Sequence, residues 1–203
     1  MEKNIVLVCP ECNKKFNADI YTSINVQLDE GMKNKVLNGN LFDIECSHCH
    51  SKFHIPYPVL YHDMEKKLLI QFTEEKDLEP VKTVLENAKA DADYTVRIVD
   101  NERDWIEKIL ISDSGLDDRI MELYKLLVLS QYEDADNVNG LYYWNIQSFE
   151  KPHYVIVLDE KKSDKMHFMP FHLDVYKQVE EVFMSDIKQE YIVDANWAVA
   201  NTK

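Results

Sequence analysis

The sequence has few glycines, no long apolar run and no excess of positive charge, and each absence excludes a class of function. The glycines are Gly31, Gly39, Gly115 and Gly140, which lie too far apart for the glycine-rich loops that bind nucleotide phosphates. No apolar run approaches the roughly 20 residues of a membrane-spanning helix, and the apolar stretch at 5–8 is too short for a secretory signal. We therefore expect a cytoplasmic protein without a phosphate-binding loop.

Negative charge is concentrated in the second part of the chain. Residues 1–73 carry 8 basic and 9 acidic residues, whereas residues 74–203 carry 15 basic and 28 acidic residues, and the net charge is −14. Nucleic-acid binding depends largely on basic side chains that neutralise phosphates, so the second part is a poor nucleic-acid surface. The shift in charge near residue 74 predicts one domain over residues 1–73 and an acidic α+β domain over residues 74–203.

The apolar periodicity predicts an α+β fold. Strands are expected at residues 5–8, 16–26, 41–45, 52–55, 67–72, 94–99, 141–146, 154–158 and 166–169. Helices are expected at residues 29–37, 78–90, 101–110, 114–127 and 173–186. Residues 1–73 would then form two hairpins with an inserted helix, and the last three strands a small antiparallel sheet.

The four cysteines have the spacing of a metal site. They form two Cys-x-x-Cys pairs, Cys9 with Cys12 and Cys46 with Cys49, and two such pairs supply the tetrahedral thiolate set that Zn²⁺ prefers. In a reducing compartment these pairs indicate metal ligands or redox thiols before structural disulfides. We expect one structural Zn²⁺ per chain in an N-terminal zinc ribbon; a redox dithiol, iron or a mixed ligand set are the alternatives. A filled shell leaves no position for catalysis.

The turns around the cysteines fit this interpretation. Asn13 and His50 follow the two pairs, at a position that often adopts the left-handed conformation, which both residue types tolerate. The 33 residues between Cys12 and Cys46 exceed the usual ribbon spacing of roughly 15–20, and the inserted helix accounts for the excess.

Several polar groups could carry chemistry, although each also has a structural interpretation. His48, His50 and His54 could replace a thiolate, but four cysteines already fill the shell. The turn of Tyr61, His62, Asp63 and Glu65 has the groups for acid–base catalysis, or is simply the polar end of a strand. Asp117, Asp118 and Arg119 could bind a cation, or the two acids could complement a helix dipole.

Two further groups lie in the C-terminal part. His153, His167 and His172 could converge near the predicted sheet, but they lack the spacing of metal ligands. Aromatic side chains could stack on a ligand, although alternating aromatics in strands usually belong to the core. This aromatic group comprises Tyr142, Tyr143, Trp144, Phe168 and Phe171.

The chain resembles the CpXC protein family, which is named for two Cys-Pro-x-Cys motifs. The resemblance rests on Cys9-Pro10-Glu11-Cys12, Ser23 to Val26, Cys46 to Cys49, Pro56-Tyr57-Pro58, Tyr61 to Glu65, Glu107-Lys108-Ile109 and Gly115 to Arg119. It covers residues 7–130 approximately, and the second cysteine pair departs from it by lacking the proline. The resemblance implies zinc binding and names no activity or substrate.

The sequence thus predicts a zinc-binding protein that is not an enzyme and has no catalytic or cofactor-binding residues besides the metal ligands. Its partner is expected to be another protein, with self-association as one form. The alternatives are a nucleic-acid-binding ribbon, which would use Lys14, Lys15 and Lys52 with the nearby histidines, and a metal-dependent hydrolase. The hydrolase would need a second metal ion outside the cysteines.

Overall fold

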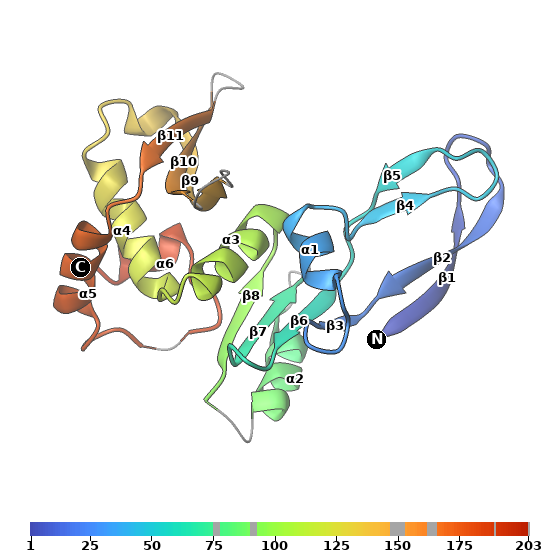
Figure 1. Cartoon of the computed structure of the whole chain (residues 1–203), viewed down its shortest axis with the longest axis horizontal. Coiled ribbons are helices and arrows are strands. Elements are labelled where there is room, and N and C mark those ends of the chain that lie inside the picture. The colour runs from blue at the N-terminus through green and yellow to red at the C-terminus, as the bar shows by residue number, and fades with distance from the viewer. Residues whose placement is uncertain (75–77, 90–92, 147–152, 162–165, 189, 203) are drawn as a thin grey trace. The chain divides into compact units, whose positions relative to one another are not determined.

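The computed structural model describes residues 1–74, 78–89, 93–146, 153–161, 166–188 and 190–202. The chain divides into two compact units, Met1–Glu102 and Arg103–Lys203, and each contains helices and strands (Figure 1). The mixed α and β composition that the sequence predicts is thus confirmed. Within the described ranges, no helix is both long and apolar enough to cross a membrane.

The first unit is built from short strands. In chain order it contains β1 (Glu2–Val8), β2 (Lys15–Tyr21), β3 (Ser23–Asn25), α1 (Met32–Leu37), β4 (Asp43–Glu45), β5 (Lys52–His54), β6 (Val59–Asp63), β7 (Leu68–Phe72), α2 (Glu79–Lys89) and β8 (Thr95–Val99). Strands β1 and β2 form one antiparallel two-stranded sheet, and β4 and β5 form another. The other strands form a four-stranded sheet in the order β3-β6-β7-β8.

The two hairpins share a small core. Phe16 and Ala18 alternate with exposed neighbours along β2, and Ile44 is the buried residue of β4. These side chains pack with Cys9 and Cys46, both of which have no exposed surface. A two-stranded sheet is marginally stable by itself, so each hairpin depends on this shared core.

The four-stranded sheet is mixed. Strand β6 pairs antiparallel with β7, whereas β3 with β6 and β7 with β8 are parallel pairs. Because parallel neighbours need a crossover connection, α2 lies between β7 and β8 in the chain. Leu68, Leu69, Ile70 and Phe72 of β7 are buried, the near-continuous apolar pattern of a strand that is covered on both faces.

Two strand expectations for this unit differ from the structure. The single strand expected at 16–26 is two strands in different sheets, since the chain bends at Thr22, whose N–H binds the Met1 carbonyl at 2.9 Å. Strand β6 was not among the expected strands, because only the polar end of a strand was considered around Tyr61 to Glu65. The first compact unit ends at Glu102, since β8 joins the sheet of β7, and the domain boundary expected near residue 74 stays a prediction.

The second unit packs helices against a three-stranded sheet. It contains α3 (Glu102–Asp113), which begins at the boundary, α4 (Asp118–Ser130), the 3₁₀-helix η1 (Ala135–Asn137), β9 (Val138–Ile146), β10 (His153–Glu160), β11 (Met166–Pro170), α5 (Leu173–Phe183) and α6 (Ala195–Ala200). Strand β10 lies in the middle and pairs antiparallel with both neighbours. The core combines buried aliphatic residues with the aromatic residues Tyr124, Tyr143, Tyr176 and Trp197.

The helix boundaries in this unit also refine the expectation. Helix α4 begins at Asp118 and not at Ser114, because Gly115, with φ +69°, separates it from α3 and the Asp117 side chain caps it by accepting from the Arg119 N–H. Helix α6 and η1 were not predicted. Residue 90, the last of the second expected helix, lies outside the described residues.

Candidate functional site

The four cysteines lie at the tips of the two hairpins. Cys9 and Cys12 occupy the loop between β1 and β2, and Cys46 and Cys49 occupy the loop between β4 and β5. Figure 1 shows the two loops side by side. All four Sγ atoms lie within 4.8 Å of one another, and among the described residues no other group of this kind is found. The sequence therefore identified the cluster, and the arrangement is compatible with a bound metal ion.

The two loops have the same backbone hydrogen bonds. In the first, the Asn13 N–H binds the Cys9 carbonyl at 2.9 Å and the Cys9 N–H binds the Lys14 carbonyl at 3.0 Å. In the second, the His50 N–H binds the Cys46 carbonyl and the Cys46 N–H binds the Ser51 carbonyl, both at 2.9 Å. Asn13 and His50 are left-handed, with φ of 55° and 60°, as the sequence predicts. The loops thus present their thiols in equivalent ways.

The sulfur spacing fits a single tetrahedral ion. Zn–S bonds of about 2.3 Å place tetrahedral sulfurs about 3.8 Å apart, and the Cys9–Cys49 and Cys12–Cys46 Sγ distances are 3.6 and 3.9 Å. Disulfide sulfurs are only about 2.05 Å apart, and all four cysteines are free. The donor set therefore suits a thiophilic metal.

Polar groups surround the sulfurs. The Cys12 N–H lies 3.4 Å from Cys9 Sγ, the His48 N–H lies 3.5 Å from Cys46 Sγ, and Cys49 Sγ donates to the Ser51 hydroxyl oxygen at 3.3 Å. Hydrogen bonds with the side chain and backbone of Ser51 lower the pKa of Cys49 to about 6. A hydrogen bond involving the Lys14 backbone lowers the pKa of Cys12, but burial and the neighbouring thiols raise it to about 12. Sequence reasoning missed Ser51, which only its place after the second pair could have suggested.

The three histidines near the second loop contact carboxylates and a backbone carbonyl. His50 Nδ1 lies 2.8 Å from Glu45, and His48 Nε2 lies 3.1 Å from the Lys15 carbonyl. His54 bridges two carboxylates, since its Nδ1 lies 2.8 Å from Asp43 and its Nε2 lies 2.6 Å from Glu102. These contacts support the interpretation that the histidines are not ligands.

The groups of the Tyr61 to Glu65 turn do not converge. Tyr61 and Asp63 point to one face of β6 and His62 points to the other, because side chains alternate along a strand. The His62 ring contacts the Tyr94 hydroxyl at 2.9 Å, and burial lowers the pKa of His62. Asp63 accepts from Gln27 at 2.7 Å and from the Lys66 N–H at 3.0 Å. The arrangement supports the structural reading of this turn.

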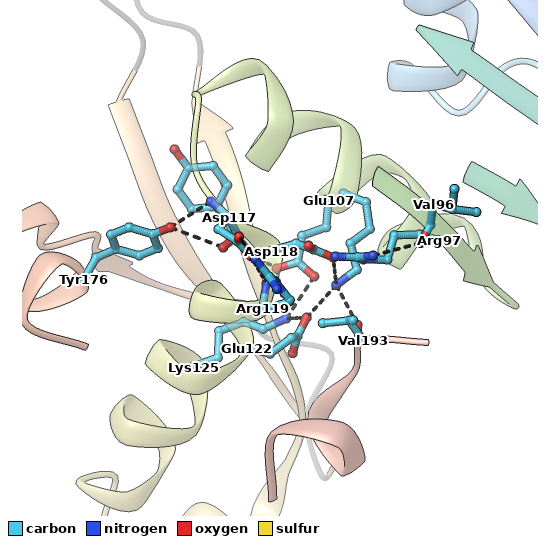
Figure 2. A network of polar contacts seen from close by, with 12 residues as sticks. Val96, Arg97, Glu107, Asp117, Asp118, Arg119, Glu122, Lys125, Tyr176 and Val193 are labelled. Atoms are coloured by element: carbon cyan, nitrogen blue, oxygen red, sulfur yellow. Dashed lines mark hydrogen bonds and ion pairs between the residues drawn. The ribbon is translucent and has the colours of Figure 1, made fainter. Parts of the chain in front are cut away.

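The acidic pair at the start of α4 splits into two roles. Asp117 caps the helix and binds the Arg119 guanidinium through both carboxylate oxygens, at 3.0 and 2.6 Å. The Tyr176 hydroxyl donates to the Asp117 carbonyl at 3.3 Å and accepts from its N–H at 2.8 Å. Asp118 turns inward to Lys108, 3.1 Å away. Capping and internal pairing therefore occupy both acids (Figure 2).

Asp118 belongs to a buried ionic cluster, which we define as Glu107, Lys108, Asp118, Glu122 and Lys125. Lys108 Nζ lies 3.1 Å from Asp118 and 3.1 Å from Glu122, and donates to the Val193 carbonyl at 2.6 Å. Lys125 Nζ lies 2.9 Å from Glu107 and 2.9 Å from Glu122. All five side chains are at most 10% exposed, so the two lysines pair with the three acids out of solvent (Figure 2).

Burial sets the ionisation in this cluster. Desolvation raises the pKa of Glu107 to about 7, opposed first by the charge of Lys125. Desolvation lowers the pKa of Lys125, but the charges of Glu107 and Glu122 raise it above its ordinary value. Sequence reasoning noted Glu107 and Lys108 only as part of a resemblance. The cluster could have been suspected from the charged residues that lie among the apolar residues of α3 and α4.

The C-terminal histidines are not brought together by the sheet. His153 pairs with Ile146 at one end of β10, whereas His167 pairs with Leu158 five positions further along. His172 precedes α5, and His167 binds Glu160 at 3.1 Å. The side chain of His153 lies outside the described residues.

Comparisons with known proteins place the site in a family. Searches of curated proteins and of solved structures find no match to the chain. The family model described as CpXC protein matches residues 7–125, more than half of the chain and a range that contains all four cysteines and the whole buried ionic cluster. The chain therefore belongs to the CpXC protein family.

Proposed function

We propose that the chain binds one Zn²⁺ through Cys9, Cys12, Cys46 and Cys49, that the ion joins the two hairpins into a zinc ribbon, and that the protein acts as a protein-interaction module. The observation that carries this proposal is the convergence of four thiols from two hairpin tips at the spacing of one tetrahedral ion. The identity and the role that we propose for the ion follow from these four sulfur ligands.

Zinc suits this site better than harder divalent ions. Four sulfur ligands in a tetrahedral arrangement indicate zinc or iron, whereas Mg²⁺ and Ca²⁺ prefer oxygen. Four protein ligands also leave no coordination position for water or substrate. We infer an architectural ion, because catalytic zinc keeps one position open.

The small size of the two hairpins indicates what the ion would do, which is to stabilise them. The sheets β1–β2 and β4–β5 have two strands each, and their shared core contains only five buried residues, among them Cys9 and Cys46. Such hairpins are marginal without further support. Metal binding at both tips would supply folding free energy directly, since structural zinc stabilises only the folded arrangement of its ligands.

An interaction role is the function that this arrangement supports best. The ion would fix hairpin surfaces in place without offering a reactive position, and Tyr61 and His62 lie on opposite faces of β6. The net charge of −14 favours protein partners over nucleic acid, whose binding needs basic surface.

Metal analysis of the purified protein tests the zinc part. We expect one zinc per chain by elemental analysis and loss of that ion in Cys46→Ser, while the adjacent Ser47→Ala retains it. Detection of one iron per chain would mean that the four cysteines bind iron and not zinc. No metal, with thiols that cycle with a disulfide partner, would favour the redox alternative.

A pull-down from the native host, repeated with Cys46→Ser, tests the interaction part. We expect a protein partner whose capture falls when the metal is lost. Salt-sensitive gel-shift binding by the intact chain would favour the nucleic-acid alternative instead. Turnover of a nucleotide, peptide or ester library that falls when Tyr61 to Glu65 are changed would refute the non-enzymatic reading.

A further inference from the structure

The outer face of the sheet in the second unit contains a cavity that no part of the proposed zinc function uses. Its volume is about 230 Å³. In the pairing register, Tyr142 lies opposite Val157, and Val157 lies opposite Phe168, so the three side chains share one face of the sheet. The lining residues are Arg103, Tyr142, Trp144, Val157, Asp159, Met166 and Phe168.

The aromatic residues of these strands divide between the two faces. Tyr143 is 1% exposed in the core, whereas Phe168 is 57% and Met166 is 50% exposed on the other face. The sequence-based preference for core positions is thus right for Tyr143 and Phe171 and wrong for Tyr142, Trp144 and Phe168. An exposed apolar surface of this kind is typical of binding sites.

Tyr142 is held in place as a wall of the cavity. A Cβ at Gly140 would lie 2.8 Å from the Tyr142 hydroxyl, so the ring lies directly over this glycine. Two cations also lie over the ring, the Arg103 guanidinium at 5.6 Å and Lys125 Nζ at 6.0 Å from the centroid. Cation–π contacts of this length are favourable. The wall is therefore preorganised before a ligand arrives.

The size and polarity of the cavity define its occupant. Pockets for whole drug-sized ligands measure about 300–1,000 Å³, so 230 Å³ suits one large side chain. The two charged residues of the lining pair with each other, Arg103 to Asp159 at 2.6 Å, so the occupant has no charge to neutralise. Aromatic walls favour an aromatic ring, which is also the commonest anchor in protein interfaces.

The net charge of the second unit indicates which kind of polypeptide would supply the aromatic side chain. Residues 103–203 contain 11 basic and 19 acidic residues, a net charge of −8. A second copy of the chain, at −14, would be repelled, whereas a basic segment would be attracted.

We propose that this cavity binds an aromatic side chain, flanked by lysine or arginine, from a partner polypeptide. The inference rests on the proposed interaction function and adds the site and the kind of partner. The Arg103–Asp159 pair and the exposed Phe168 ring, both in the cavity lining, would contact the inserted side chain.

Titration of the full chain with short peptides tests the site. The probe is the blocked pentapeptide Lys-Lys-Trp-Lys-Lys, compared with versions that have a central alanine or glutamate flanks, and with free indole. Chemical shifts of the Trp144 indole and the Met166 methyl report occupancy. We expect binding by the parent peptide, weaker binding with rising salt, and loss of affinity in both altered peptides.

Two variants locate the binding. Phe168→Ala is expected to weaken the parent peptide about fivefold or more, the effect of truncating an interface anchor. Leu173→Ala is the matched control, since Leu173 is also an exposed apolar residue of this unit, at 52%, and lies outside the cavity lining. Both positions are exposed, so both variants are expected to fold.

Four results would overturn the inference. The first is the absence of saturable binding by the parent peptide, and the second is equal loss of affinity in both variants. The third is binding of free indole as tight as that of the peptide, which would make the cavity a small-molecule site. A host partner that Phe168→Ala still captures would also overturn it, while the proposed interaction function would stand.

Discussion

Replacing Lys108 by methionine tests whether the buried ionic cluster stabilises the second unit. The substitution keeps most of the side-chain volume but removes the charge that lies 3.1 Å from Asp118 and 3.1 Å from Glu122, and the donor to the Val193 carbonyl at 2.6 Å. Asp118 and Glu122 are 9% and 4% exposed, so water cannot replace the lost partner.

The expected cost is large. Removing one partner of a buried ion pair destabilises proteins by about 3–5 kcal/mol, because the other charge stays buried without compensation. Lys177→Met is the matched control: Lys177 is 55% exposed and pairs with Glu180 three residues along α5, a kind of pair worth about 0.2–0.5 kcal/mol. A variant that also carries Asp118→Asn removes the negative charge that lies 3.1 Å from the lost cation and should regain part of the loss.

Urea unfolding monitored by tryptophan fluorescence measures the free energy of unfolding of the second unit. Trp105, Trp144 and Trp197 are the tryptophans of the chain, and all three belong to the second unit. The fluorescence transition therefore reports on that unit even if the two units unfold separately. A loss in Lys108→Met of less than about 1 kcal/mol, near that of the control, would refute the claim that the cluster is stabilising.

Three further predictions concern other parts of the molecule. A strong chelator, or Cys46→Ser, should unfold residues 1–73 first and raise amide exchange in β1, β2, β4 and β5 while the tryptophan signal persists; loss of both signals together would show one cooperative structure. Hydrogen bonds to Glu102 and then Asp43 raise the pKa of His54 above 6.5, so its stabilising contribution is complete below pH 6.5 and is lost as pH rises through the folded pKa. An imidazole titration by NMR checks this, and a midpoint at or below 6.5 would contradict it, with His54→Gln expected to flatten the pH dependence. Gly140→Ala should displace the Tyr142 side chain, whose hydroxyl oxygen lies 2.8 Å from the added methyl position, and destabilise the second unit by about 1–3 kcal/mol; an unchanged urea midpoint would argue against the close packing.

Local signals in the sequence predicted the cysteine cluster well. The spacing of Cys9, Cys12, Cys46 and Cys49 identifies two tight turns, and turn geometry depends on neighbouring residues only. That Asn13 and His50 adopt positive φ follows from the same local rule. Convergence of the two turns could be expected because thiolate pairs of this kind rarely have another use in a reducing compartment.

Long-range pairing could not be predicted in the same way. Nothing local distinguishes Thr95–Val99, which joins β7 in the first unit, from a strand of the second unit. The same limit hid the ionic cluster, since Lys108 and Glu122 look like surface charges until α3 and α4 pack together. Tyr142 and Tyr143 are neighbours in a strand of aromatic residues, and only the sheet register determines which one faces the core.

The contact between Lys108 and the Val193 carbonyl has a practical consequence for anyone who trims this protein to its family segment. A fragment ending at Lys125 would cut α4 within Asp118–Ser130 and discard the carbonyl that Lys108 binds. It would also uncover Ile120 and Tyr124, which are buried with Tyr176 and Trp197 from the discarded part. The limit of the family match is thus a boundary of sequence similarity and not of folding, and fragments of the second unit should extend through α6.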